Sequence, residues 1–311
     1  MNKKTTLILA MISCTLWASV FPVVKLLLEE LDITSNTSGK MALAGMRFFT
    51  AGILILIASI IMNKKLPLPK KREWTNIMRV GLFQTTGLYG LYYTSIAFVP
   101  GVKASIISQG GIFYMIILAY FFLGERVRRQ HMIGIAFGII GIIVLNLDSL
   151  TDVSTLSAFS LKGEGLLLLS GVFGSLGQIT AKKRCHNIPP MTLNGWQMTL
   201  GGGVLLIIGS TMNRGLVSFP SVFSLFLMSY SIMVAAVGFT LWYFLLLRTS
   251  VNDIVPYRLT IPVLGSIFSA LFLPGESLTL NIILGLAIVV FGMYIITFFN
   301  DKDLKVRVDT D

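Results

Sequence analysis

LGERVRRQHMIGIAFGIIG, at residues 123–141, recurs in the chain as LPGESLTLNIILGLAIVVFG at residues 273–292. An offset of 151 residues pairs Gly124 with Gly275, Glu125 with Glu276, Gly134 with Gly285, and Gly141 with Gly292. Further upstream, an offset of 150 places Leu91, Tyr92 and Tyr93 over Leu241, Trp242 and Tyr243, and one inserted residue near Pro274 reconciles the two offsets. A repeat of this length indicates two copies of one structural half.

The composition is typical of a membrane protein. Of the 311 residues, 54% are hydrophobic and 13% are charged, whereas soluble domains carry about 25% charged residues. The net charge of +11 does not predict a nucleic-acid partner, because basic residues in short loops between apolar spans act as topology signals. The two cysteines, Cys14 and Cys185, have neither a disulfide pattern nor metal-ligand spacing.

Ten segments are apolar and long enough for the roughly 20 residues that cross a bilayer as a helix. They cover residues 6–28, 41–62, 76–98, 102–123, 131–148, 164–182, 192–212, 222–247, 253–273 and 280–299. With the N-terminus inside, seventeen Lys and Arg residues fall on the inner side and five on the outer side. We therefore expect a multi-pass protein of the bacterial cell membrane with both termini in the cytoplasm.

The repeat and the span count together predict the fold class. Each half holds five spans, an odd number, so the second half enters the membrane from the opposite face. The prediction is an all-α integral membrane protein whose ten transmembrane helices form two inverted five-helix repeats, a construction used by secondary transporters. The expected boundaries are residues 1–148 for the first repeat, 149–163 for an external linker, 164–299 for the second repeat, and 300–311 for a cytoplasmic tail.

No enzyme motif is present in the sequence. It lacks a Gly-x-x-x-x-Gly-Lys-Ser/Thr phosphate loop, a Gly-x-Ser-x-Gly nucleophile turn and a His-Glu-x-x-His metal motif. His131 and His186 lie beside basic clusters, where a solvated interface is a better interpretation than metal binding. We therefore expect no enzymatic activity, no cofactor and no metal.

Two arginines inside predicted spans are candidate binding residues, because a charge at the bilayer centre costs about 2.5 to 3.5 kcal/mol on insertion scales. Arg47 lies some six residues into the second span and Arg258 some five residues into the ninth. Each is shallow enough to reach the headgroups with its side chain. The alternative interpretation is an anion-attracting group that lines a central cavity.

Polar and aromatic residues in other spans complete the candidate binding site. Side chains with a ring and a polar tip can stack on a small solute or hydrogen-bond to it, although they also populate membrane interfaces. The predicted substrate-binding residues are Trp17, Arg47, Gln84, Tyr89, Tyr93, Gln178, Trp242, Tyr243 and Arg258.

Prolines and two carboxylates are candidates for structural or gating roles. Pro22, Pro256 and Pro262 free backbone carbonyls within or near spans, and such kinks serve either as hinges or as static bends. Glu125 and Glu276 each follow a glycine at the C-terminal end of a span, where a negative charge opposes the helix dipole. We expect them to bond backbone amides at the start of the next helix, with proton carriage as the alternative.

The chain resembles the EamA-type members of the drug/metabolite transporter superfamily. The resemblance rests on LWASVFPVVK at residues 16–25, Arg47-Phe48-Phe49, LGER at 123–126, the glycines at 134–141, and residues 262–276 of the second half. In the second half, Gln197 occupies the position that Arg47 holds in the first. It implies a ten-helix carrier with a central cavity that exports amino acids or other small metabolites. Ile112 departs from the pattern, because the family has a proline there like the one that Pro262 supplies.

These observations predict a secondary transporter that moves a small metabolite across the bilayer by alternating access, in the outward direction. The scarcity of buried carboxylates leaves open an uncoupled facilitator or channel. A membrane subunit or sensor that needs a partner, and a homodimeric assembly, are also left open.

Overall fold

The computed structural model of the chain describes residues 2–96, 98–99, 104, 107–145, 147, 160–273 and 279–298. Regular structure in these ranges is entirely helical and falls into ten segments, which confirms the predicted fold class. In chain order they are α1 (Lys3–Glu30), α2 (Thr37–Asn63), α3–η2–α4 (Trp74–Gly81, Leu82–Gly87, Leu88–Ser95), α6 (Gly110–Leu123), α7 (Arg129–Leu145), η4–α9 (Leu161–Gly165, Leu166–Arg184), α10 (Pro190–Met212), α11 (Val222–Arg248), α12–η5–α13 (Val251–Ile254, Val255–Leu259, Thr260–Phe272) and α14 (Leu280–Phe298). A short 3-10 turn, η1 (Lys71–Glu73), precedes α3.

Length and hydropathy differ among the segments. Five segments are by themselves long and apolar enough to cross a membrane: α1, α2, α11, Val251–Phe272 and α14. By contrast, α6 and α7 are apolar but shorter, and α9 and α10 carry more glycine and polar residues. The polar side chains of α10 are buried inside the bundle, as Asn194 and Gln197 show with no exposed surface. Such helices face other helices rather than lipid, so they need less apolar surface.

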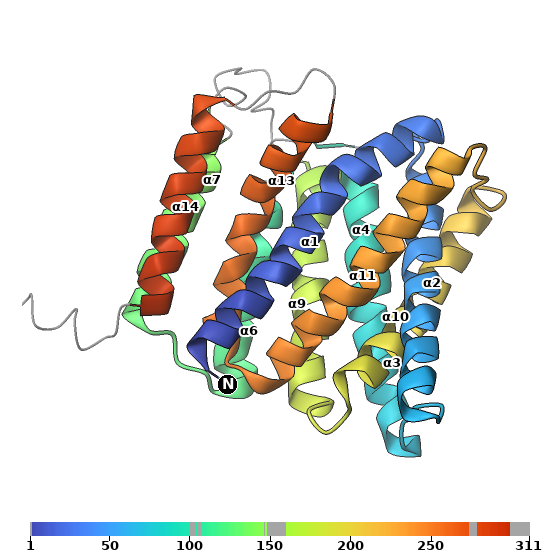
Figure 1. The fold of residues 1–311 in the computed structure, drawn as a ribbon, viewed down its shortest axis with the longest axis horizontal. Helices are drawn as coiled ribbons and strands as arrows, with labels where there is room; N and C mark the ends of the chain where they lie inside the picture. Colours follow the sequence, from blue (N-terminus) through green and yellow to red (C-terminus); the bar gives the residue numbers. More distant parts are fainter. Residues whose placement is uncertain are drawn as a thin grey trace, which may run out of the picture.

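At one edge of the bundle α2 packs against α10 through glycines (Figure 1). A Cβ built on Gly45 would lie 2.3 Å from the amide nitrogen of Leu206, and one built on Gly209 would lie 2.3 Å from that of Ala42. Only glycine permits two backbones to approach this closely. Small-residue motifs of membrane helices allow the same kind of contact. Residue numbers rise on α2 as they fall on α10, so the two helices run antiparallel.

The opposite edge, formed by α7 and α14, shows how the two repeats are related (Figure 1). A Cβ on Gly134 would lie 2.6 Å from the carbonyl oxygen of Gly292, and one on Gly141 would lie 2.8 Å from that of Gly285. The repeat aligns Gly134 with Gly285 and Gly141 with Gly292, so each glycine meets the counterpart of the other. Crosswise contact between equivalent positions of antiparallel helices is what two inverted copies produce.

In the interior, the first helix of each half packs against helices of the other half. The first helix of the first half, α1, packs against α11 and α13 of the second half. In the same way α9, the first helix of the second half, packs against α4 and α6 of the first. Figure 1 shows α1 and α11 side by side between the two edges. Any site in the middle of the bundle is therefore lined by both halves.

Local departures from α-helix occur near the candidate residues. Gln84 lies in the π-helical segment η2, against which Gly177 of α9 packs so closely that a Cβ there would lie 2.7 Å from the Gln84 amide nitrogen. Pro22 lies within α1, Pro256 falls in the first turn of the 3-10 segment η5, and Pro262 lies in the first turn of α13. Irregular backbone inside a membrane bundle is tolerated where it is buried in protein or lines a cavity.

Several predicted features lie outside the described residues. Glu276 is one of them, and so are the tail at 300–311 and residues 149–159 of the predicted linker. Residues 161–163 at the end of that linker belong to η4. The domain boundaries therefore stay predictions.

Candidate functional site

The centre of the bundle holds a cluster of aromatic rings from four helices. Trp17 of α1 packs on two rings of α11, with centroid distances of 4.8 Å to Phe239 and 5.3 Å to Trp242. From α2, Phe48 lies 4.4 Å from Tyr89 of α4 and 6.1 Å from Phe239. The rings therefore form one continuous cluster, which we call the aromatic cluster, at the contact between the two halves.

Arg47 joins this cluster from α2. Its Nε donates a hydrogen bond to the main-chain carbonyl of Ser231 in α11 at 3.0 Å, and its guanidinium carbon lies 5.1 Å from the centre of the Phe48 ring. It also lies close enough to Tyr89 and Tyr93 to interact with them electrostatically. Arginine has five N–H donors, and the hydrogen bond to Ser231 engages one of them. The side chain is thus held inside the bundle rather than extended toward lipid headgroups.

Arg258 approaches the same cluster from η5. It is half-buried and interacts electrostatically with Tyr89 and with the thiol of Cys14 on α1. Tyr89 therefore interacts electrostatically with both Arg47 and Arg258. Neither guanidinium is paired with a carboxylate in the part of the chain that the structure describes. Two unpaired cations beside polar aromatic rings form an environment that attracts an anionic group.

Three of the predicted binding residues carry buried polar atoms without a hydrogen-bond partner among the described residues. These atoms are the indole nitrogen of Trp17, the amide oxygen of Gln84 and the hydroxyl of Tyr243. By contrast, the indole nitrogen of Trp242 donates to the amide oxygen of Gln178 at 2.8 Å. A buried polar group left without a partner costs about 1 to 3 kcal/mol. In native structures each such group has an explanation, which can be a bound water or ion or a functional role.

Sequence reasoning missed some members of the cluster. Phe48 and Phe239 are apolar aromatic residues, which occur throughout membrane spans, so composition did not distinguish them. Gln197 was aligned with Arg47 but was not proposed as a site residue. It accepts a hydrogen bond from Thr85 and donates one to Asn194, both at 2.9 Å. The position that carries a cation in one half therefore carries a satisfied buried amide in the other.

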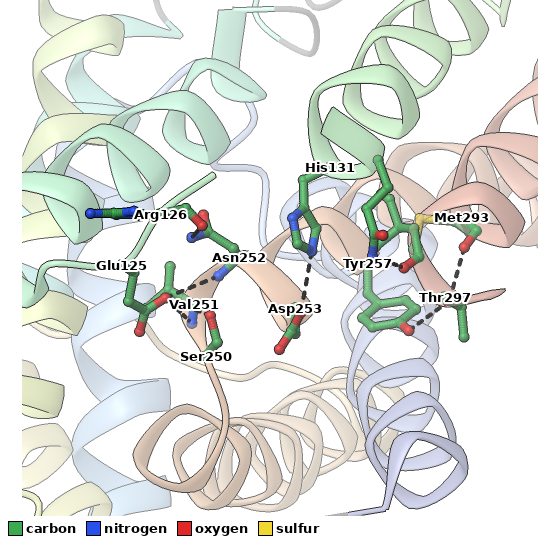
Figure 2. A network of polar contacts seen from close by, with 12 residues as sticks. Glu125, Arg126, His131, Ser250, Val251, Asn252, Asp253, Tyr257, Met293 and Thr297 are labelled. Carbon is green, nitrogen blue, oxygen red and sulfur yellow. Dashed lines mark hydrogen bonds and ion pairs between the residues drawn. The ribbon is translucent and has the colours of Figure 1, made fainter. Parts of the chain in front are cut away.

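A second polar network lies on the face of the bundle where the chain begins (Figure 2). Glu125, at the end of α6, accepts hydrogen bonds from the Ser250 hydroxyl at 2.6 Å and the Val251 amide at 2.8 Å. Its other oxygen lies 3.5 Å from the ammonium of Lys182. Glu125 thus bonds a backbone amide at the start of a helix, but of α12 in the other half rather than of α7. Whether it is structural or carries a proton stays a prediction.

The position of His131 differs from the sequence-based expectation. We expected a solvated interface, whereas His131 is 1% exposed and its Nε2 lies 3.2 Å from a carboxylate oxygen of Asp253. The carboxylate that His131 contacts comes from α12 in the other half (Figure 2). His186, by contrast, is exposed as expected. In the described residues no group of three His, Cys, Asp or Glu side chains is placed to hold a metal ion.

Comparison with known proteins assigns the chain to a family. The model of the EamA-like transporter family matches residues 4–147 and 161–298, which is nearly the whole chain. The chain belongs to the EamA-like transporter family. It is thus a multi-pass membrane transporter of small metabolites and not an enzyme, and its two matched stretches correspond to the two repeats.

Curated relatives are similar over nearly their full lengths. A probable amino-acid metabolite efflux pump of Escherichia coli (strain K12) is 28% identical, with 94% of both chains covered. A protein of the same description from Salmonella typhimurium is 27% identical over 93% of this chain and 94% of its own. An uncharacterized inner membrane transporter of Escherichia coli is 24% identical over 91% of this chain and 87% of its own.

A solved crystal structure of a protein has the same fold. Its TM-score is 0.76 and its sequence identity is 16%, and the match covers 95% of this chain and 98% of the other. At that identity the likeness supports the arrangement of helices alone.

Proposed function

We propose that this transporter exports a small metabolite that carries a carboxylate, an amino acid or a related compound, by alternating access between the two repeats. The observation that carries the proposal is the placement of Arg47. Its side chain is fixed to the Ser231 carbonyl of the opposite half, close to Tyr89 and Tyr93, without a carboxylate partner among the described residues. A carboxylate of the solute is the complementary group, because guanidinium and carboxylate form charge-assisted hydrogen bonds.

The rest of the cluster suits the remainder of such a solute. The rings of Trp17, Phe48 and Phe239 offer apolar faces. Within the cluster, the indole nitrogen of Trp17 offers a donor that has no other partner in the described residues. The outward direction and the amino-acid class draw support from the relatives described as probable amino-acid metabolite efflux pumps.

Comparison of extracellular metabolites tests this proposal. Cells that overproduce the chain are compared with empty cells and with cells that make equal amounts of Arg47→Ala or Arg79→Ala. Arg79 is the matched control, because it lies in the third span but is exposed. We expect one or more amino-acid-like compounds to accumulate outside with the parent and with Arg79→Ala, and not with Arg47→Ala. Profiles that match those of empty cells would contradict the proposal.

An uncoupled facilitator is the second candidate. It is favoured by one observation: among the described residues, Arg47 and Arg258 lie beside the aromatic cluster, and no carboxylate that would carry a coupling proton is seen to interact with Tyr89 there. Uptake into vesicles that hold the purified protein alone separates the two functions. Accumulation against a gradient that an uncoupler abolishes supports the coupled transporter, whereas equilibration alone supports the facilitator. Absence of any transport would support the partner-dependent role.

For location we propose the bacterial plasma membrane, with both termini in the cytoplasm. The excess of Lys and Arg on one side of the predicted topology supports this orientation. Reporter fusions at residues 2 and 311 that are active only in the cytoplasm test it. Activity of a periplasmic reporter at either end would overturn the assignment.

A further inference from the structure

The face of the bundle where the chain begins has a pocket of about 520 Å³ that is separate from the aromatic cluster. Both repeats contribute to its wall: the end of α6 and start of α7 on one side, and the α11–α12 junction on the other (Figure 2). The lining residues are Glu125, Arg126, Val127, Arg128, Arg129, His131, Ser250, Asn252 and Asp253.

The pocket has an excess of positive charge. Its two carboxylates are already engaged: Glu125 with Lys182 and Ser250, and Asp253 with His131. Arg128 and Lys3 also lie close enough to Asp253 to interact with it electrostatically.

The three arginines of the wall remain available. In the part of the chain described here, the guanidinium groups of Arg126, Arg128 and Arg129 form no ion pair or hydrogen bond with another residue. All three side chains are exposed to solvent at the pocket. An arriving anion would therefore meet three N–H forks that hold no hydrogen bond to another described residue, and of these Arg128 alone is also attracted by Asp253.

Two deeply buried side chains of the wall also have an unused polar atom. His131 and Asn252 are each 1% exposed, and neither His131 Nδ1 nor Asn252 Oδ1 has a hydrogen-bond partner among the described residues. The Asn252 amide nitrogen donates to the carbonyl of Arg126, which leaves its oxygen as the free atom. Figure 2 shows the second ring nitrogen of His131 turned toward the side on which Asn252 lies. Nδ1 of His131 is the ring nitrogen that the contact with Asp253 leaves unused.

The wall therefore offers donors on the arginines together with the acceptor oxygen of the Asn252 amide. We propose that this pocket binds a phosphate group that carries a proton, whether free phosphate or the headgroup of phosphatidate. Such a group accepts hydrogen bonds from guanidinium N–H groups and donates one O–H to the buried amide oxygen of Asn252. Sulfate matches the charge but has no proton to donate at neutral pH. Occupancy would connect α7 of one half to α12 of the other.

The test is a titration of the purified full-length protein in uncharged detergent. Thermal unfolding is followed with sodium phosphate and with sodium sulfate at equal ionic strength, and the apparent dissociation constants are compared. We expect phosphate to bind at least about tenfold more tightly than sulfate, the effect of about one hydrogen bond to a charged group. Equal stabilisation by both salts would indicate a general salt effect and overturn the proposal, as would no response to either salt together with no stabilisation by phosphatidate in nanodiscs.

Variants connect the response to the pocket. We expect Arg126→Gln and Arg129→Gln each to weaken phosphate binding by about tenfold. Arg72→Gln, a change of an exposed arginine outside the pocket, should leave it unaltered. Unchanged binding in both pocket variants would overturn the proposal. If a variant does not fold, the preference of the parent protein for phosphate over sulfate still decides.

Nanodiscs distinguish the two sources of the phosphate group. A response to free phosphate in phosphatidylcholine nanodiscs supports a soluble ligand. Stabilisation by phosphatidate but not by phosphatidylglycerol, which is lost in Arg126→Gln, supports a lipid headgroup. Stabilisation by both lipids alike, with no response to free phosphate, would overturn the proposal in favour of simple surface charge.

Discussion

Arg47 donates its Nε hydrogen bond to the main-chain carbonyl of Ser231, 3.0 Å away in the opposite repeat. The acceptor is a backbone atom, so the bond fixes the guanidinium without neutralising its charge. The same side chain lies near Tyr89 and Tyr93. One half thus supplies the cation and the other half orients it, which makes the charge sensitive to any movement between α2 and α11.

The first prediction concerns solute affinity. Removal of the guanidinium in Arg47→Ala should weaken binding of carboxylate-bearing solutes by tenfold or more, since hydrogen bonds to charged groups contribute about 1.5 to 3 kcal/mol. Arg47→Lys keeps the charge but loses the fork geometry of the guanidinium. Its affinity for the solute should therefore lie between those of the parent and of Arg47→Ala. Transport by purified protein in vesicles, measured over a range of solute concentrations, gives the Michaelis constants.

A decarboxylated analogue of the transported solute supplies the control for that prediction. Its transport should change little between the parent and Arg47→Ala, because the group that Arg47 binds is missing. Equal losses for the solute and its analogue would mean that Arg47 holds the helices together and does not contact the solute.

The second prediction concerns the glycines that join the two repeats. Gly45→Ala adds a Cβ that would lie 2.3 Å from the Leu206 amide nitrogen, so α2 and α10 must separate. Overpacking of this kind costs about 1 to 3 kcal/mol. Gly90→Ala is the matched control, because the nearest atom to its added Cβ lies at 3.7 Å and alanine favours helix over glycine. Thermal unfolding in detergent should show a lower midpoint for the first variant only, and equal midpoints would contradict the close backbone contact.

The third prediction concerns the contact between Glu125 and Lys182. The two side chains are partly buried, and the Glu125 carboxylate also accepts a hydrogen bond from the Val251 amide. We expect Glu125→Ala to destabilise the protein. Lys182→Met should destabilise the Glu125→Ala variant less than it destabilises the parent. The coupling free energy should fall in the range of about 0.5 to 3 kcal/mol that contacting residues show.

A double-mutant cycle on unfolding midpoints measures this coupling, with the exposed Lys65→Met in place of Lys182→Met as the control. Additive effects in the Lys182 cycle, like those expected with Lys65, would show that the ion pair adds nothing to stability.

The ten helices could be predicted from sequence because the length and hydropathy of a span are local properties. The inverted repeat was predictable for a similar reason: Gly134 and Gly141 recur at a fixed offset as Gly285 and Gly292. Arg47 could be selected because a charge inside an apolar span is costly wherever it points. Each of these signals requires no knowledge of what lies next to the residue in space.

The polar contacts between the halves were beyond the sequence for the opposite reason. His131 follows Arg128 and Arg129, and these neighbours indicate a solvated position. Asp253, whose carboxylate contacts the ring, comes from the other repeat, 122 residues along the chain. Glu125 likewise pairs with an amide 126 residues away. Hydropathy indicates how strongly a polar group prefers water. It does not indicate which protein group takes the place of water when the polar group is buried.

The last prediction concerns Cys185, which follows α9 outside the spans. Burial raises the pKa of its thiol to about 12, and the nearby Glu73 carboxylate adds to the shift. Only the thiolate attacks maleimides, so at pH 8 about one molecule in ten thousand is reactive, and the fraction rises about tenfold per pH unit. We expect very slow labelling of the folded protein, because Cys14 is also fully buried. His186→Cys, which places a thiol at the exposed neighbouring position, should react within minutes under the same conditions. Mass spectrometry of the labelled peptides distinguishes the two sites, and rapid modification of Cys185 in the folded parent would show that the end of α9 opens to water.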